Sequence, residues 1–188
     1  MKLYVIRHGQ SETNIKKCFT GWAQVNLTEN GIQQAESIRP VLENISFDRV
    51  FSSDLHRAMK TAETALPGCK YETTPLLREV GMGSLEMQPI ADVQADMKEK
   101  NTAQLGYGMY GGESREEFAV RVAEFRKMVE SLDCENVAAF SHWGWLMELL
   151  TQVLEVKIPS GNITGKNCMV AIFEYENAHW KLHSWINQ

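Results

Sequence analysis

The chain has 188 residues, of which 44% are hydrophobic and 23% are charged. These proportions are typical of a globular protein, and a chain of this length can bury about 70% of its unfolded surface, which argues against a disordered, fibrous or membrane class. The formal net charge of −5 offers no long-range attraction to nucleic acid or to anionic lipid, so we expect neither partner, and an anionic substrate needs a local basic site.

The four cysteines form neither a C-x-x-C pair nor a metal-ligand spacing, which favours a reduced protein. The apolar run before Arg7 is too short for the core of a signal peptide. We therefore expect a cytoplasmic protein.

The first half of the chain alternates strand and helix patterns. Residues 3–6 form a short apolar run that is typical of a buried strand, and apolar residues at helical spacing from Thr28 to Ile45 predict a helix. Residues 49–51 predict a second strand. Ser53 or Asp54 can cap the helix that follows, which ends at Pro67-Gly68.

The second half repeats this alternation after an irregular stretch. Residues 84–113 contain several glycines and a helix from Pro89 to about Lys100, and we interpret them as a lid or cap. The remaining expected elements are a strand near 70–73, a helix that begins at Ser114, a strand at 137–140, a helix at 143–154, and a hairpin of 169–175 with 180–186 around Asn177.

Together these elements predict an α/β fold. We expect a three-layer sandwich with a mostly parallel central sheet, helices on both faces, an antiparallel C-terminal strand pair and a short cap insertion. The absence of a composition break predicts a single domain over residues 1–188, with the cap at about 84–113.

Polar residues follow the predicted strands where the carboxyl ends of a parallel sheet meet. The residues in question are Arg7 and His8, then Arg57, then Glu79, and finally His142. In open α/β sheets the binding crevice lies beyond these ends, so we expect the five side chains to converge. Each of them alone is more often a structural or a solvated residue, and only their joint placement favours a site.

This set of side chains is suited to phosphate chemistry. Two guanidinium groups can hold the equatorial oxygens of a phosphoryl group in transfer. A neutral imidazole nitrogen can attack phosphorus, and the positive charge of Arg7 and Arg57 would lower the pKa of His8 and keep it neutral. His8 is therefore the expected nucleophile.

The same residues belong to longer motifs. Residues 7–14 read Arg-His-Gly-Gln-Ser-Glu-Thr-Asn, and this stretch resembles the signature of the histidine phosphatase superfamily, which includes the cofactor-dependent phosphoglycerate mutases. The resemblance continues, in order, at Leu27-Thr28-Glu29-Asn30-Gly31, Ser52-Ser53-Asp54-Leu55 with Arg57, Leu77-Arg78-Glu79, Gly111-Gly112-Glu113-Ser114 and Ser141-His142. It covers residues 3 to about 155.

The resemblance implies a role for each matching residue. His8 would be phosphorylated, and Glu79 would donate and accept the proton. The phosphoryl group would be bound by Arg7, Arg57 and His142. Asn14 would donate a further hydrogen bond to it. We count His142 both with the catalytic and with the phosphate-binding residues.

The chain departs from the family pattern at three positions. Ser11 stands where threonine is more frequent, and Met87 and Trp143 stand where glycine is usual. We expect the two bulky residues to change either the local backbone or the pocket wall. Further candidates for lining the pocket are Ser11, Thr20, Gly21, Trp22 and Trp143. Core packing is an equal alternative for Trp22, Trp143 and Trp145.

We therefore expect a metal-independent phosphomonoesterase that acts on a small phosphorylated metabolite through a phosphohistidine. No cofactor and no metal site is expected. The principal alternative is a cofactor-dependent phosphoglycerate mutase, and a less favoured one is an inactive binding protein with this fold. The sequence is also compatible with a homodimer. His179 and His183 have the spacing of helical metal ligands, but residues 180–186 alternate as a strand, which favours a structural role.

Overall fold

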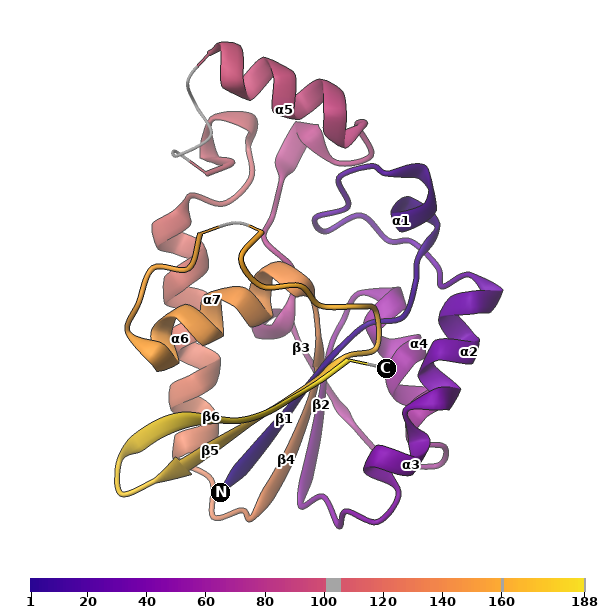
Figure 1. Ribbon diagram of the computed structural model, residues 1–188, viewed down its shortest axis with the longest axis vertical. Helices are drawn as coiled ribbons and strands as arrows, with labels where there is room; N and C mark the ends of the chain where they lie inside the picture. Colours follow the sequence, from indigo (N-terminus) through magenta and orange to yellow (C-terminus); the bar gives the residue numbers. More distant parts are fainter. Residues whose placement is uncertain (101–105, 160, 188) are drawn as a thin grey trace.

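The computed structural model describes residues 1–100, 106–159 and 161–187. Six strands form one sheet in the order β3-β2-β4-β1-β5-β6 (Figure 1). The strands are β1 (Lys2–Arg7), β2 (Arg49–Ser53), β3 (Glu72–Thr74), β4 (Asn136–Ser141), β5 (Val170–Glu176) and β6 (His179–Ile186).

The four strands from β3 to β1 run parallel, and β5 and β6 are antiparallel to their neighbours. The hairpin of β5 and β6 turns at Asn177 and Ala178, which both have positive φ, 52° and 62°. A two-residue turn with positive φ at both positions matches the twist of the flanking strands. The predicted antiparallel C-terminal pair is confirmed.

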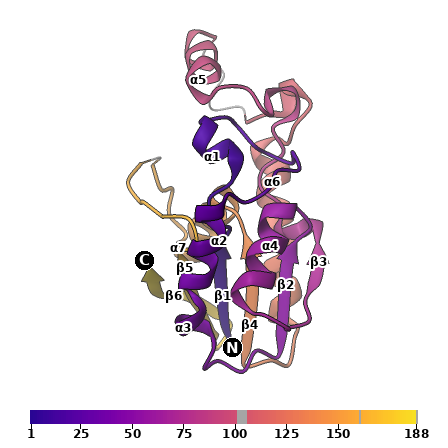
Figure 2. The ribbon, with the colours of Figure 1, turned by 90° about the vertical axis from the view of Figure 1, so that its right-hand side faces the viewer.

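Helices cover both faces of the sheet, which gives the predicted three layers. The helices are α1 (Glu12–Lys16), α2 (Glu29–Ser37), α3 (Arg39–Leu42), α4 (His56–Ala65), α5 (Ile90–Glu99), α6 (Arg115–Glu130) and α7 (Trp143–Leu154). α6 and α7 pack on one face, and α2, α3 and α4 pack on the other (Figures 1 and 2).

The central strand β1 shows how the sequence builds this arrangement. Leu3 and Val5 point into the core under α6 and α7, whereas Tyr4 and Ile6 point into the core under α2 to α4. Because side chains alternate between the two faces of a strand, an unbroken apolar run can be buried only where both faces are covered. β1 therefore lies in the middle of the sheet.

Three of the predicted element boundaries are wrong. The stretch from Thr28 to Ile45 contains two helices, α2 and α3, because Pro40 has no N–H with which to continue the first of them. α4 begins at His56, with Leu55 as its N-cap, since Asp54 binds Arg78 instead of capping the helix. β3 occupies Glu72–Thr74 and not 70–73.

The segment predicted as a cap lies beyond the carboxyl ends of the parallel strands. Its residues 101–105 lie outside the described residues. Its described part contains the 3₁₀ turns η2 (Gly83–Leu85), at the start of the segment, and η4 (Gly108–Tyr110), with α5 between them. Figure 2 shows α5 far from the sheet, past α1. We propose that residues 84–113 are a cap on a single domain that spans residues 1–188. In the described part of the chain, no helix is both long and apolar enough to cross a bilayer.

Candidate active site

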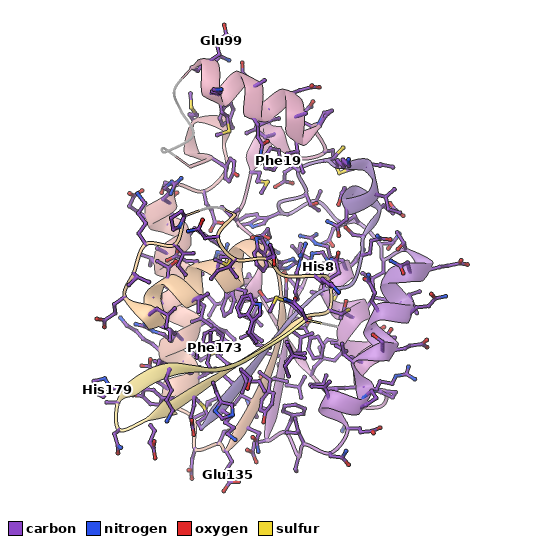
Figure 3. The ribbon with its side chains drawn as sticks, viewed as in Figure 1. His8, Phe19, Glu99, Glu135, Phe173 and His179 are labelled. Carbon is purple, nitrogen blue, oxygen red and sulfur yellow. The ribbon has the colours of Figure 1, made fainter. Side chains whose placement is uncertain are left out.

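Two histidines meet at the carboxyl ends of β1 and β4. These strands are parallel neighbours in which Arg7 and Ser141 are register partners, so the next residues, His8 and His142, leave adjacent strand ends together. Their ring centroids are 5.1 Å apart, and both side chains are buried. In Figure 3, His8 lies at the end of the sheet that faces the cap, and Glu135 marks the opposite end.

The hydrogen bonding of His8 determines which ring nitrogen is free. Nδ1 lies 2.7 Å from the carbonyl oxygen of Gly9. Because a carbonyl only accepts, Nδ1 must carry the proton, and the neutral ring then has its lone pair on Nε2. The pKa of His8 is held well below its ordinary value by burial and by the positive charges of Arg57 and Arg7. The ring is therefore neutral at physiological pH.

The backbone around His8 is held on several sides. The N–H of His8 donates to Ser141 across the sheet at 3.0 Å, and its carbonyl accepts from the Asn167 side chain at 3.1 Å. Gly9 approaches Gly31 so closely that an added Cβ would lie 2.4 Å from the Gly31 carbonyl oxygen. The turn after β1 therefore requires glycine at position 9.

Arg57 is buried at the start of α4, although it lies off the apolar stripe of that helix. Only 1% of its surface is exposed. Its Nη2 donates to the Gly21 carbonyl at 2.8 Å and its Nη1 to that of Ala23 at 3.0 Å. Burial lowers the pKa of Arg57 to about 10, while the charges of Glu79 and Glu86 oppose the shift. The guanidinium keeps its charge and has no carboxylate within ion-pair distance among the described residues.

Three buried nitrogen atoms in this region have no partner within the described part of the chain: Nε of Arg7, Nε of Arg57 and Nδ1 of His142. On the other side of the His142 ring, Nε2 lies 2.9 Å from Oγ of Ser53. The Ser53 hydroxyl also accepts from the Leu55 N–H, so it can give its own proton to Nε2 and leave the proton of His142 on Nδ1. All three atoms are then donors, and unpaired buried donors are suited to an anion.

Glu79 lies at the edge of this group, where one backbone amide from its own loop and one from α7 donate to its carboxylate. Oε1 accepts from Val80 and Oε2 accepts from Gly144, both at 3.0 Å. Gly144 is in the first turn of α7, where backbone N–H groups have no partner within the helix and can donate to a side-chain oxygen. A Cβ on Gly144 would lie 2.3 Å from Oε1, so a larger residue there would push the Glu79 carboxylate out of this position.

Arg121 of α6 ties down the backbone that carries Glu79, and sequence reasoning did not single it out. Its Nη2 donates to the Glu79 carbonyl at 2.9 Å, and its Nη1 donates to the Arg78 carbonyl at 2.8 Å. The same guanidinium binds both oxygens of Glu113, and Glu113 accepts from the Gly81 N–H at 2.7 Å. The backbone is thus hydrogen-bonded both before and after Glu79, at the Arg78 carbonyl and at the Gly81 amide.

A second ion pair lies beside this stretch. Arg78 donates two hydrogen bonds to the Asp54 carboxylate, one of them from Nε at 2.7 Å. The same guanidinium stacks on the Trp22 ring, 4.9 Å from its centroid, and Trp22 Nε1 donates to the Glu79 carbonyl. The guanidinium of Arg78 holds the pKa of Asp54 below its ordinary value. Asp54 therefore keeps its charge and orients the segment before Glu79.

Four more predicted site residues, Ser11, Asn14, Thr20 and Gly21, lie in α1 and the segments on either side of it. Asn14 accepts through Oδ1 from the Ser11 N–H and from the Asn167 side chain, which leaves its Nδ2 as a donor. The hydroxyl groups of Ser11, Thr13 and Thr20 form a chain with spacings of 3.0 and 2.7 Å. Ser11 is thus buried and hydrogen-bonded within this part of the chain. Gly21 has φ of +51° and presents its carbonyl to Arg57.

The three tryptophans near the motifs have different surroundings. Trp145 is completely buried in the core. Trp22 is 39% exposed and lines a cavity of about 480 Å³ with Gly81, Glu86 and Gly112. Trp143, at the first position of α7, packs against Arg7. Trp145 therefore lies in the core, Trp143 packs both against the core and against Arg7, and Trp22 lies beside Glu79.

Met87, one of the departures from the family pattern, has a backbone conformation that is typical of glycine. It adopts a positive φ of 68°, a conformation that glycine adopts freely and that costs a methionine energy. Its backbone N–H donates to the Phe19 carbonyl at 2.7 Å, and its side chain is exposed. The backbone therefore keeps a conformation that suits the usual glycine.

Another cavity, of about 320 Å³, lies between the first turns of α6 and α7. Val80 and Gly144 border it, and their amides are the ones that bind Glu79; Tyr107 and Lys157 also line it. Among the described residues there is no group of three or more histidine, cysteine, aspartate or glutamate side chains that could hold a metal ion.

Comparisons with known proteins identify the family to which the chain belongs. The family model of the histidine phosphatase superfamily, branch 1, matches residues 3–188. The adenosylcobalamin/α-ribazole phosphatase of Salmonella typhimurium is 32% identical over 167 residues, which is 85% of this chain and 83% of the relative. A probable phosphoglycerate mutase of Proteus mirabilis is 27% identical over 99% of this chain and 90% of its own length.

Solved structures of two other proteins have the same fold as this chain. The α-ribazole phosphatase of Shigella flexneri has a TM-score of 0.84 at 26% identity, over 98% of this chain and 96% of the other. The phosphoglycerate mutase of Bacillus anthracis, at 24% identity over 98% and 92% of the two chains, shows the same fold with a TM-score of 0.86. The match of the family model over nearly the whole chain shows that this protein belongs to the histidine phosphatase superfamily.

Proposed function

We propose that this protein is a phosphomonoesterase that transfers the phosphoryl group of a small substrate to Nε2 of His8 and then to water, without a metal ion. The observation that carries this proposal is the state of His8. It is buried and neutral, and its Nδ1 proton is committed to the Gly9 carbonyl. Nε2 is therefore the atom with the free lone pair, which a nucleophile requires.

In the first step the phosphoryl oxygens are bound by the donors around His8. Nε of Arg7, Nε of Arg57 and Nδ1 of His142 are buried without a partner in the described chain, and Asn14 Nδ2 is a further donor. Fixed donors of this kind stabilise the charge of the transferring group without reorganising during the reaction. Nε2 of His8 forms a bond to phosphorus while the bond from phosphorus to the leaving oxygen breaks.

Glu79 is the proposed proton carrier. Its carboxylic acid gives a proton to the leaving oxygen, so that the product departs as a neutral alcohol. In the second step the Glu79 carboxylate takes a proton from water as that water attacks phosphorus. The bond between phosphorus and Nε2 then breaks, which regenerates neutral His8 and releases inorganic phosphate.

The charge of the cap favours hydrolysis over mutase activity. Within the described residues of the 84–113 segment, the lysines are Lys98 and Lys100, and Lys100 is paired with Asp96 at 2.7 Å. The same segment carries Glu86, Asp92 and Glu99. A mutase must retain an intermediate with several negative charges, and this cap attracts it poorly. A phosphoglycerate mutase is the second candidate, because the Proteus relative covers almost the whole chain.

The first substrate to test is a nucleoside-like monophosphate such as α-ribazole phosphate. Two related proteins, from Salmonella and Shigella, are described as α-ribazole phosphatases. The Arg78 guanidinium covers part of the Trp22 ring, and the exposed remainder, beside Glu79, is the surface on which we expect an aromatic leaving group to stack.

The test is hydrolysis of p-nitrophenyl phosphate and of α-ribazole phosphate, with and without a chelator. The proposal predicts turnover that a chelator does not reduce. Strict dependence on metal would contradict the mechanism, and absence of turnover by folded protein from pH 4 to pH 8 would contradict the function. Interconversion of phosphoglycerates with trace bisphosphate, at a rate above that of hydrolysis, would identify a mutase instead.

A further inference from the structure

Trp143 is a bulky residue at the phosphate-binding end of the sheet, at a position where the family pattern usually has glycine. It follows His142 directly and occupies the first position of α7. Its indole ring faces the guanidinium of Arg7, with Cζ of Arg7 5.5 Å from the ring centroid. A cation at this distance over an indole is attracted to the negative face of the ring.

Gly165 contacts both Arg7 and Trp143. Its carbonyl oxygen accepts from Nη1 of Arg7 at 2.6 Å. Its Cα lies against the indole of Trp143, since an added Cβ would be 2.1 Å from Cζ3 of the ring. The guanidinium of Arg7 thus donates a hydrogen bond to a carbonyl and packs on the face of a ring. Gly165 has no side chain that would prevent either contact.

Trp185 of β6 supports Trp143 from behind. The two rings meet edge to face with centroids 6.2 Å apart. Nε1 of Trp185 donates to the Thr164 carbonyl at 3.3 Å, next to Gly165 in sequence. The indole of Trp143 therefore lies between Trp185 and the guanidinium of Arg7.

This arrangement orients Arg7 without neutralising it. No carboxylate lies within ion-pair distance of Arg7 among the described residues, and its Nε is buried without a partner there. A carboxylate would fix the guanidinium equally well, but it would compete with the phosphate for its charge and its donors. A ring and a carbonyl fix the group and leave the charge available to a dianion.

We propose that Trp143 is a positioning residue, which acts through Arg7 to aim its free N–H groups at the phosphoryl oxygens. This inference rests on the proposed function, because it assumes that Arg7 binds phosphate. It assigns to this chain a device that the usual glycine at this position cannot provide.

The test compares two apolar replacements of similar size. Trp143→Phe keeps a ring face, whereas Trp143→Leu fills space without one. We measure the dissociation constants of inorganic phosphate and orthovanadate by calorimetry, KM and kcat for p-nitrophenyl phosphate, and the melting temperature. The expected result is that Trp143→Leu weakens anion binding and raises KM by about tenfold, and that Trp143→Phe stays within about threefold of the wild type.

A double-mutant cycle separates positioning from general stability. In an Arg7→Ala background, Trp143→Leu should weaken anion binding by less than about twofold, since no guanidinium remains to be aimed. Trp180→Leu, at the far hairpin, is the matched control and should leave anion binding unchanged.

Several outcomes overturn the inference. One is equal anion binding by the Leu and Phe variants, and another is a tenfold effect of Trp143→Leu that persists without Arg7. A wild-type protein that binds no phosphate and hydrolyses no phosphomonoester would instead overturn the proposed function.

Discussion

The imidazole rings of His8 and His142 lie with their centroids 5.1 Å apart, although the two residues are far apart in the sequence. Their proximity follows from one pairing in the sheet, in which Arg7 of β1 is the register partner of Ser141 of β4. A strand register fixed by burial on both faces therefore sets the geometry of the site. Burial of the two rings also has consequences for stability.

The pH dependence of stability should report the two buried histidines. The pKa of each is held well below its ordinary value by burial and by the charge of Arg57. The unfolded chain takes up protons at these residues as the pH falls through about 6.5, whereas the folded chain does not. The free energy of unfolding should therefore be greatest above this pH and decrease below it.

Urea unfolding between pH 4.5 and pH 8 measures this effect. His8→Asn, which keeps a donor for the Gly9 carbonyl, should make the decrease below pH 6.5 shallower. His179→Asn, at the exposed hairpin, should leave the slope as it is in the wild type. An identical slope in His8→Asn and the wild type would show that His8 does not titrate differently in the two states.

Arg121→Ala should impair catalysis by releasing the segment around Glu79. The substitution removes the Arg121 donors to the Arg78 and Glu79 carbonyls and leaves Glu113 without its ion-pair partner. A displacement of the carboxylate by about 1 Å costs about 100-fold in rate, so we expect kcat to fall between tenfold and 100-fold. Steady-state kinetics with p-nitrophenyl phosphate give the value.

The matched control is Arg126→Ala, which removes a longer ion pair, to Glu130, on the same helix. We expect its kcat within about twofold of the wild type. Equal kcat values for the Arg121 and Arg126 variants would mean that Glu79 keeps its place without the clamp.

Gly144→Ala tests the contact between α7 and Glu79. The new Cβ would lie 2.3 Å from Oε1 of Glu79, and the carboxylate must move away from both α7 and its amide partner. We expect kcat/KM to fall by about 100-fold while the circular dichroism spectrum is retained.

Gly108→Ala is the control for this substitution. The nearest atom to its added Cβ is 3.7 Å away, and its φ is not in the left-handed region. It should behave like the wild type. If Gly144→Ala retained wild-type kcat/KM, the contact between the Gly144 amide and Glu79 would have no catalytic role.

The order of elements and the residues at the strand ends could be predicted from the sequence. Apolar runs and helical spacing are local signals, and the rule that parallel strands share their carboxyl ends brought His8, Arg57, Glu79 and His142 together. Boundaries were predicted less well where a tertiary contact competed with a local one. Asp54 is an example, because it has the chemistry of a helix cap and binds Arg78 instead.

The contacts that hold the site could not be predicted in the same way. Arg121 lies between Phe118 and Val122 on a helix whose apolar stripe was evident, and nothing local indicates that it reaches the Glu79 backbone 42 residues away. Trp143 was recognised as a bulky departure, but its partners Gly165 and Trp185 belong to other elements. Such partners depend on the packing of α6, α7 and β6, which a single sequence does not specify.

The central claim is that a phosphohistidine forms at His8. Rapid acid-free quenching of the wild-type protein with a ³²P-labelled phosphomonoester, followed by mass spectrometry of peptides at alkaline pH, measures it directly. We predict a label that is lost in acid, retained in alkali and located on Nε2 of His8, and its absence from folded His8→Ala. A label on any other residue, or turnover by His8→Ala at the wild-type rate, would contradict the account.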